Sequence, residues 1–232
     1  MAKKRSKRYT AAIEKIGPHT PMDLASAIEK LKQLPPVKFD QTLSLAFRLG
    51  VDPKQSDQMV RGTVGLPHGS GKKVRVLVFA KGAAAQAAKD AGAEYVGFED
   101  LIKKCTEGFT DFDVAIATPE AMNEVRKLGK VLGPRGLMPN PKTGTVTDDT
   151  AKAVRECKAG RVEFKVDKNA NVHVPFGKIS FTSQQLIENG QAVIDAVLKA
   201  RPPAAKGTYL RRVSVAATQT PSLTVAINKT TN

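Results

Sequence analysis

The stretch VRVLVFA, residues 74–80, is almost continuously apolar. Such a run is typical of a strand that is covered by helices on both faces of its sheet. The run DVAIAT, residues 113–118, has the same character, and a shorter strand is predicted over residues 93–98. Helical patterns follow each of these strands. Strands that alternate with helices indicate a doubly wound α/β block with a parallel sheet, over about residues 70–159.

The strands on both sides of this block have a different pattern. In FDQTLSLAFRL, residues 39–49, Leu43, Leu45 and Phe47 alternate with small or polar residues, as in a strand with one buried face. A helix that opens at Thr20-Pro21, with Thr20 as its cap, would supply apolar surface to cover such strands. Further elements of this kind are a long amphipathic helix over 183–200 and strands over 58–66, 161–167, 172–175, 211–217 and 222–227.

Neither flank is large enough to bury a good core by itself. We therefore predict a protein of mixed α/β and α+β class with two domains. One is a discontinuous α+β domain built from residues 1–68 and 160–232, and the other is a Rossmann-like α/β domain, residues 69–159, inserted into it. Both crossings contain glycine, which favours a hinge.

The charge of the chain indicates its kind of partner. Among 232 residues, Lys and Arg number 37 against 22 Asp and Glu, a net charge of +15. Such an excess favours a phosphate backbone, because neutralising phosphates releases counterions. The aromatic fraction of 5% argues against base stacking as the main binding mode. No apolar run approaches the roughly 20 residues of a spanning helix, and no signal peptide is recognisable, so we expect a cytoplasmic protein without a membrane partner.

Motifs for catalysis or cofactor binding are lacking. Cys105 and Cys157 have no paired ligands for zinc. The glycine-rich stretch 65–72 differs from a phosphate-binding loop, because five residues instead of four separate its glycines and it precedes the strand. The turn after residue 80 lacks the GxGxxG pattern. We predict no enzyme, no cofactor, no metal and no homo-oligomer; an enzyme that binds a nucleotide on the middle block is the competing hypothesis.

Two segments are rich in basic residues. The start of the chain, MAKKRSKR, is interpreted as an arm on RNA through Lys3, Lys4, Arg5, Lys7 and Arg8. The segment 129–145, GKVLGPRGLMPNPKTGT, is rich in glycine and in proline, and proline lowers the entropy lost on binding. Between residues 125 and 147 there is no acid, and the basic residues are Arg126, Lys127, Lys130, Arg135 and Lys142. A rigid basic loop of this kind favours contact with phosphate.

These motifs resemble those of one family. GKVLGPRGLMPNPKTGTV (129–146), LGVDPKQSDQMVRGTVGLPHGSGK (49–72) and GKISF (177–181) are together similar to the bacterial form of the family of large-subunit ribosomal protein one, found in the mobile stalk beside the tRNA exit site. The resemblance extends over essentially the whole chain. It implies a first domain that binds stalk rRNA and, with the same surface, the family's own messenger RNA, whose translation it represses. It also implies an inserted domain that reaches the exiting tRNA. We assign the basic residues at 126–142 to this contact with tRNA.

The resemblance also implies which residues face the rRNA. Matching positions on the sheet of the first domain and on its turns are Phe39, Thr42, Asp167, Lys168, His173 and Thr218. In this scheme Phe39 packs on a ribose or base, the two threonines bond to 2′-hydroxyls and Lys168 meets phosphate. Asp167 would orient a basic neighbour or accept a ribose hydroxyl. Taken without the resemblance, all of these residues except Lys168 would be read as ordinary core, strand and turn residues.

The chain departs from the family's pattern at two turns. It has Gln219-Thr220 where the family has Met-Gly, and Ala170 where a glycine usually stands. We expect RNA contacts at the first of these turns to be longer or to use the new side chains. A free translational repressor that acts mainly on messenger RNA stays open as an alternative, since it would use the same surface.

Overall fold

The computed structural model describes residues 5–17 and 20–226. The chain forms two compact units. The first unit combines Met1–Gly71 with Val162–Asn232, and the second unit is Lys72–Arg161. Each is described by itself below.

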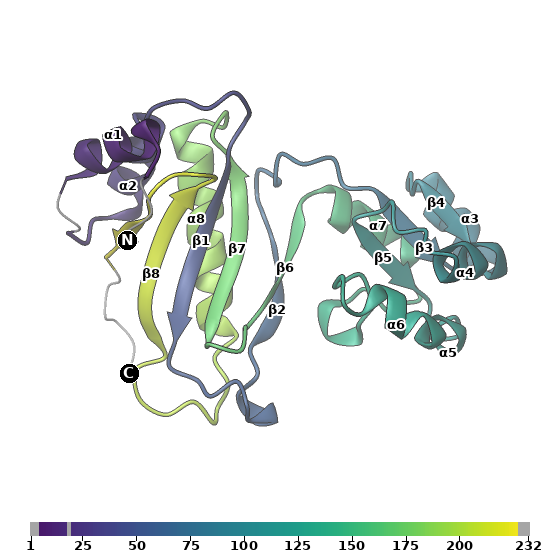
Figure 1. The fold of residues 1–232 in the computed structure, drawn as a ribbon. Helices are drawn as coiled ribbons and strands as arrows, with labels where there is room; N and C mark the ends of the chain where they lie inside the picture. Colours follow the sequence, from purple (N-terminus) through teal and green to yellow (C-terminus); the bar gives the residue numbers. More distant parts are fainter. Residues whose placement is uncertain (1–4, 18–19, 227–232) are drawn as a thin grey trace. The chain divides into compact units, whose positions relative to one another are not determined.

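The first unit is built on an antiparallel sheet of four strands in the order β7-β1-β8-β9 (Figure 1). These strands are β1 (Thr42–Leu49), β7 (Asn171–Lys178), β8 (Leu210–Ala217) and β9 (Leu223–Val225). A separate two-stranded ladder pairs β2 (Arg61–Gly65) with β6 (Arg161–Lys165). The helical elements are α1 (Lys7–Ile16), α2 (Leu24–Lys32), the 3-10 turn η1 (Ser56–Gln58) and α8 (Ser183–Lys199). Strand β1 comes from the N-terminal part of the chain and pairs on both sides with strands from the C-terminal part.

The alternation predicted for β1 is confirmed. Leu43, Leu45 and Phe47 are buried, and the residues between them are partly exposed. The buried side chains face α8, which lies along one face of the sheet (Figure 1). Helix α2 packs beside α8. In the described part of this unit, no helix covers the opposite face of the sheet (Figure 1).

The second unit has a parallel sheet of three strands in the order β4-β3-β5. The strands are β3 (Val76–Phe79), β4 (Tyr95–Gly97) and β5 (Val114–Ala117). Val76 and Val78 pack with α3 (Gly82–Asp90) and α7 (Thr150–Lys158). Leu77 and Phe79 face the opposite layer. That layer consists of α4 (Glu99–Thr106), α5 (Met122–Val125), the 3-10 turn η2 (Arg126–Leu128) and α6 (Gly129–Leu132). The predicted strand with helices on both faces is thus confirmed, and the fold is mixed α/β.

Two expectations about helices were wrong. Helix α2 does not begin at Thr20-Pro21 but at Leu24, with Asp23 as its cap. Met22 is held extended because its N–H donates to Thr224 O and its carbonyl accepts from the N–H of Ala226. The segment 129–145 was expected to be a loop, but helical turns that follow β5 continue to residue 132, so the first residues of this segment are helical.

One crossing out of the first unit is fixed by a buried amide. Asn189 of α8 is fully buried. Its Oδ1 accepts from the N–H of His68 at 3.0 Å, and its Nδ2 donates to Gly69 O at 3.0 Å and to Phe176 O at 2.8 Å. The carboxylate of Glu188 contacts the ring of His68 as well. The residues just before the second unit are therefore tied to α8.

We expect Asn189→Ala to lower the free energy of unfolding by about 3 kcal/mol, because one buried and two part-buried hydrogen bonds to the backbone are lost. Chemical denaturation measures this loss. The control is Gln191→Ala on the same helix, which removes an exposed i,i+4 hydrogen bond to Asp195 and costs less than about 0.5 kcal/mol. Equal losses for the two variants would contradict the role given to Asn189.

Candidate nucleic-acid interface

The uncovered face of the antiparallel sheet is lined by small side chains. Strand β1 contributes Thr42, Ser44 and Ala46 to it. The register places Ala46 between His173 of β7 and Ser214 of β8. Small residues leave the face flat, and the hydroxyl groups offer hydrogen bonds. A surface of this kind fits the wide, shallow minor groove of double-stranded RNA, where 2′-hydroxyls are displayed.

At one end of this face Thr42 and Thr218 are joined. Thr218 N–H donates to Thr42 O at 3.0 Å, and the Thr218 hydroxyl lies 3.2 Å from both the N and the O of Thr42. Gln41 adds a bond to Thr218 O at 2.6 Å. Phe39, which precedes this cluster, has 45% of its surface exposed, so it is not a core residue. The structure thus joins Thr42 to Thr218 from the opposite part of the chain, and Phe39 precedes Thr42 by three residues.

Lys178 belongs to this cluster and was missed in the sequence. Its Nζ donates to the hydroxyl of Thr42 at 2.7 Å. The Thr42 hydroxyl therefore keeps its proton and one lone pair for another partner. The ammonium lies beside it, so a phosphate could be bound next to a ribose. Lys178 is the lysine of the GKISF motif at residues 177–181. This motif contributes to the family resemblance, but its lysine was assigned no role from the sequence alone.

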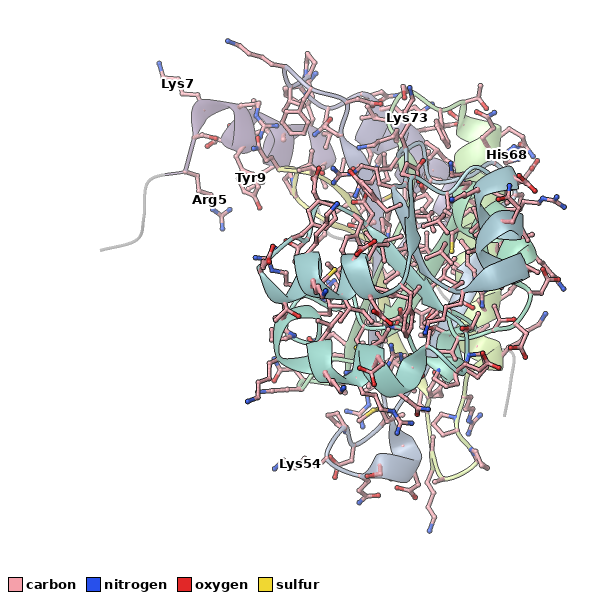
Figure 2. The ribbon with its side chains drawn as sticks, turned by 90° about the vertical axis from the view of Figure 1, so that its right-hand side faces the viewer. Arg5, Lys7, Tyr9, Lys54, His68 and Lys73 are labelled. Carbon is pink, nitrogen blue, oxygen red and sulfur yellow. The ribbon has the colours of Figure 1, made fainter. Side chains whose placement is uncertain are left out.

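The N-terminal helix also reaches this end of the sheet. Arg8 of α1 donates from Nη2 to Gln219 O at 2.7 Å, and its Nη1 is buried without a hydrogen-bond partner. The guanidinium of Arg5 lies 5.3 Å from the ring centroid of Tyr9. Figure 2 shows Arg5 and Tyr9 on one side of the helix and Lys7 on the other. A surface hollow is lined by Arg5, Ser6, Arg8, Tyr9, Gln219 and Thr220. The predicted contacts at Lys3 and Lys4 lie outside the described residues.

Asp167 and Lys168 lie at the other end of the sheet, in the turn between β6 and β7. The Asp167 carboxylate accepts from the N–H groups of Asn171 at 2.7 Å and Asn169 at 2.8 Å. These bonds, with that of Asn171 the largest cause, hold the pKa of Asp167 below its usual value. The carboxylate therefore shapes the turn, and Lys168 projects from it as an exposed cation. The candidate rRNA residues occupy both ends of the face instead of one cluster.

Both turns where the chain departs from the family contain left-handed backbone. In the described residues, Ala170 and Gln219 are the non-glycine residues with positive φ, at 61° and 62°. The second lies one residue before Thr220, the position of the missing glycine. The hydroxyl of Thr220 instead bonds to the N and the O of Ala217, at 3.0 and 2.9 Å. A side-chain hydroxyl thus closes the turn at the position where the family has a glycine.

The basic segment of the second unit is anchored by apolar side chains. Leu132 is buried, and Leu137 and Met138 pack partly buried on the same core. The cations at Arg126, Lys127, Lys130 and Arg135 are exposed, whereas the side chain of Lys142 is outside the described residues. Two of the four are engaged. Lys127 pairs with Glu124 at 2.5 Å, and Arg135 donates to the hydroxyl of Thr110. The acid-free stretch 125–147 therefore has an acid, Glu124, directly before it.

Among the described residues, no group of three or more His, Cys, Asp or Glu side chains is placed to hold a metal ion. None of the helices described is long and apolar enough to span a membrane.

Comparison with known proteins gives the class of this chain. Residues 24–221 match the model of the Ribosomal protein L1p/L10e family. Since the match covers most of the sequence, the chain belongs to this family, which is one of ribosomal proteins and not of enzymes.

Within the family the chain is similar to bacterial proteins named Large ribosomal subunit protein uL1. The protein of Renibacterium salmoninarum is 55% identical over 227 residues, covering 98% of this chain and 97% of the relative. That of Thermobifida fusca is 52% identical over the same length, with the same coverage.

The strained turn at Gln219 gives a stability prediction. We expect Gln219→Gly to raise the free energy of unfolding by about 0.5 kcal/mol, because relief of the left-handed conformation exceeds the added freedom of the unfolded chain. Thr220→Gly is the matched control and should lower it by about 1 kcal/mol through loss of the hydroxyl bonds. Thermal unfolding of the two variants measures both. A loss of stability in Gln219→Gly would contradict the proposed strain.

The bonds of Asp167 give a pH dependence. Its folded pKa is below the unfolded value of 3.8, so its stabilisation is complete above that value and is lost as pH falls through the folded pKa. We expect Asp167→Asn to be less stable than the parent protein at pH 7, with the difference shrinking below about pH 4. Asp57→Asn, at an exposed carboxylate with no backbone bond among the described residues, is the control. A difference that stayed constant down to pH 2 would rule this out.

Proposed function

We propose that this protein is a structural RNA-binding component of the large ribosomal subunit and works in the cytoplasm. The observation that carries the proposal is the near-full-length similarity to proteins named for that subunit. The net charge of +15 supports it, because rRNA is the polyanion that such a subunit offers. The proposal includes no cofactor, no membrane partner and no homo-oligomer.

The first unit is the proposed rRNA grip, and its target is the stalk region. The uncovered sheet face supports this, since its hydroxyl groups and flanking cations suit RNA shape and 2′-hydroxyl contacts. Phe39, Thr42 and Thr218 would act at one end, together with Lys178 and Arg8. Lys168 would act at the other end, with His173 along β7 between the two ends. Messenger RNA of the protein's own operon would bind the same surface, and its translation would be repressed.

The second unit is proposed to contact deacylated tRNA in the exit site and to take part in its release. Arg126 and Lys130 support this, because both are exposed and neither forms an ion pair among the described residues. The compact units are proposed to be separate domains, at about residues 1–68 with 160–232 and 69–159. The compact units, Met1–Gly71 with Val162–Asn232 and Lys72–Arg161, begin and end within a few residues of these positions.

Phe39 provides the test of the rRNA grip. We expect Phe39→Ala to weaken binding of a stalk rRNA fragment by about tenfold or more, because stacking on an aromatic ring is lost. Fluorescence anisotropy with the full chain measures the affinity. Met59→Ala is the control, since Met59 is exposed to a similar extent, 48%, outside the proposed face. The grip is wrongly placed if both variants bind like the parent protein, or if a DNA copy of the stalk binds equally well.

The role of the second unit is tested separately. The double variant Arg126→Gln, Lys130→Gln should keep its affinity for stalk rRNA and its cosedimentation with large subunits in high salt, but release exit-site tRNA at a changed rate. Lys103→Gln, Lys104→Gln on α4 is the charge-matched control. Loss of rRNA binding in the first pair would place the grip in the second unit. A clear thermal shift with a nucleotide at micromolar concentration would instead revive the enzyme hypothesis.

A further inference from the structure

Two arginines are directly opposite each other on the uncovered sheet face. The register pairs Arg48 of β1 with Arg212 of β8, and both side chains are exposed. Directly opposed residues in an antiparallel pair have Cβ atoms only about 4.5–5.5 Å apart, and like charges in that position are destabilising. Nothing in the packing of the strands requires this pair, because both side chains point away from the core.

A β-bulge concentrates the charge further. Leu49 pairs with Leu210, whereas Arg48 pairs with Arg212, so Arg211 is an extra residue in β8. The bulge keeps Leu210 buried while Arg211 and Arg212 are both exposed. Bulges re-aim side chains in this way and are frequent beside functional sites. Without it, one of these two arginines would have to point into the core.

The arginine pair is not neutralised by the protein. In the part of the chain that the structure describes, no carboxylate forms an ion pair with Arg48 or Arg212. Arg212 instead donates to the hydroxyl of Thr224 at 2.9 Å, which fixes its position on the face. In the adjoining turns, Asp52 accepts from the N–H of Lys54, and Asp167 is engaged as described above. Asp57 is exposed and forms no ion pair with either arginine among the described residues.

We propose that Arg48 and Arg212 form a phosphate clamp that binds the RNA backbone at the end of the sheet opposite Thr42. This deepens the proposed function and rests on it. Thr42 and Arg48 are six positions apart in β1, which at about 3.3 Å per residue is about 20 Å. The RNA would thus be held at two points, by hydroxyl and aromatic contacts at Thr42 and by charge at the clamp.

The residues between the ends favour RNA over an acidic protein as the occupant. Ser44, Ala46, Ser214 and Ala216 offer no large apolar side chain, and the core of a protein interface is usually built on such side chains. A polar face flanked by cations matches a ribose-phosphate backbone instead. The clamp would contribute affinity without reading sequence, since phosphates carry no base identity.

The test compares Arg48→Gln, Arg212→Gln and the double variant with Arg155→Gln, an exposed arginine of α7 in the second unit. The ligand is the stalk rRNA fragment, titrated with the full chain over a series of salt concentrations. Each single variant is expected to weaken binding about tenfold and to reduce the slope of log affinity against log salt by about 1. Arg155→Gln should change neither quantity.

The temperature of unfolding distinguishes the clamp from a structural role of the two arginines, because loss of a structural role would lower that temperature. Relief of the like-charge pair should leave the temperature of unfolding of the free protein unchanged or higher in each single variant. An unchanged affinity and salt slope would overturn the clamp, and so would a fall in stability that accounts for the weaker binding. If Phe39→Ala weakens binding and the arginine variants do not, the clamp alone fails. If the parent protein does not bind stalk rRNA, the proposed function fails with it.

Discussion

The rest of the first unit depends on the pairing of β1 between β7 and β8. This ladder joins residues 42–49 to residues 171–178 and 210–217, so more than a hundred residues lie between paired strands. The entropy of closing so long a loop rises only with the logarithm of its length, and the second unit forms its own core within it. An insertion of this size is therefore tolerated. Without this pairing, neither α8 nor the N-terminal helices would have a sheet to cover.

Successive residues of β1 lie on opposite faces of the sheet, and the two faces have different roles. Leu43, Leu45 and Phe47 make the core, while the residues between them form the face left for a partner. A slip of one residue would exchange the two sets, so the register has to be exact between the ends. Both ends of β1 nevertheless lie beside register shifts, one at Leu43/Ser44 and one at Arg48/Leu49. Bulges there alter which side chains are exposed at the ends and leave the centre of the strand in place.

Patterns local to the chain could be predicted, and effects of pairing between distant segments could not. The buried runs at 74–80 and 113–118 and the alternation at 39–49 specify their own strands. The helix predicted from Thr20-Pro21 does not begin there because Met22 pairs with β9. Arg48 and Arg212 are opposite each other only because of the register between β1 and β8. Residues 1–8 were predicted to be a basic arm because charge dominates them, but Lys7 and Arg8 begin helix α1, which Ser6 caps and in which Ala12 and Ile16 are buried.

The two departures from the family pattern show how the turns at the sheet ends are held without glycine. A residue with φ near 60° costs about 1–2 kcal/mol unless it is glycine, so Ala170 and Gln219 need compensation. At each turn a neighbouring side chain supplies it, the carboxylate of Asp167 in one and the hydroxyl of Thr220 in the other. Such bonds make the turn stiffer than a glycine would, because the side chain and the backbone are fixed together. These turns therefore present a preformed surface to a binding partner. Because they need less ordering on binding, the entropy that is saved offsets the affinity that is lost where Thr220 prevents a close approach.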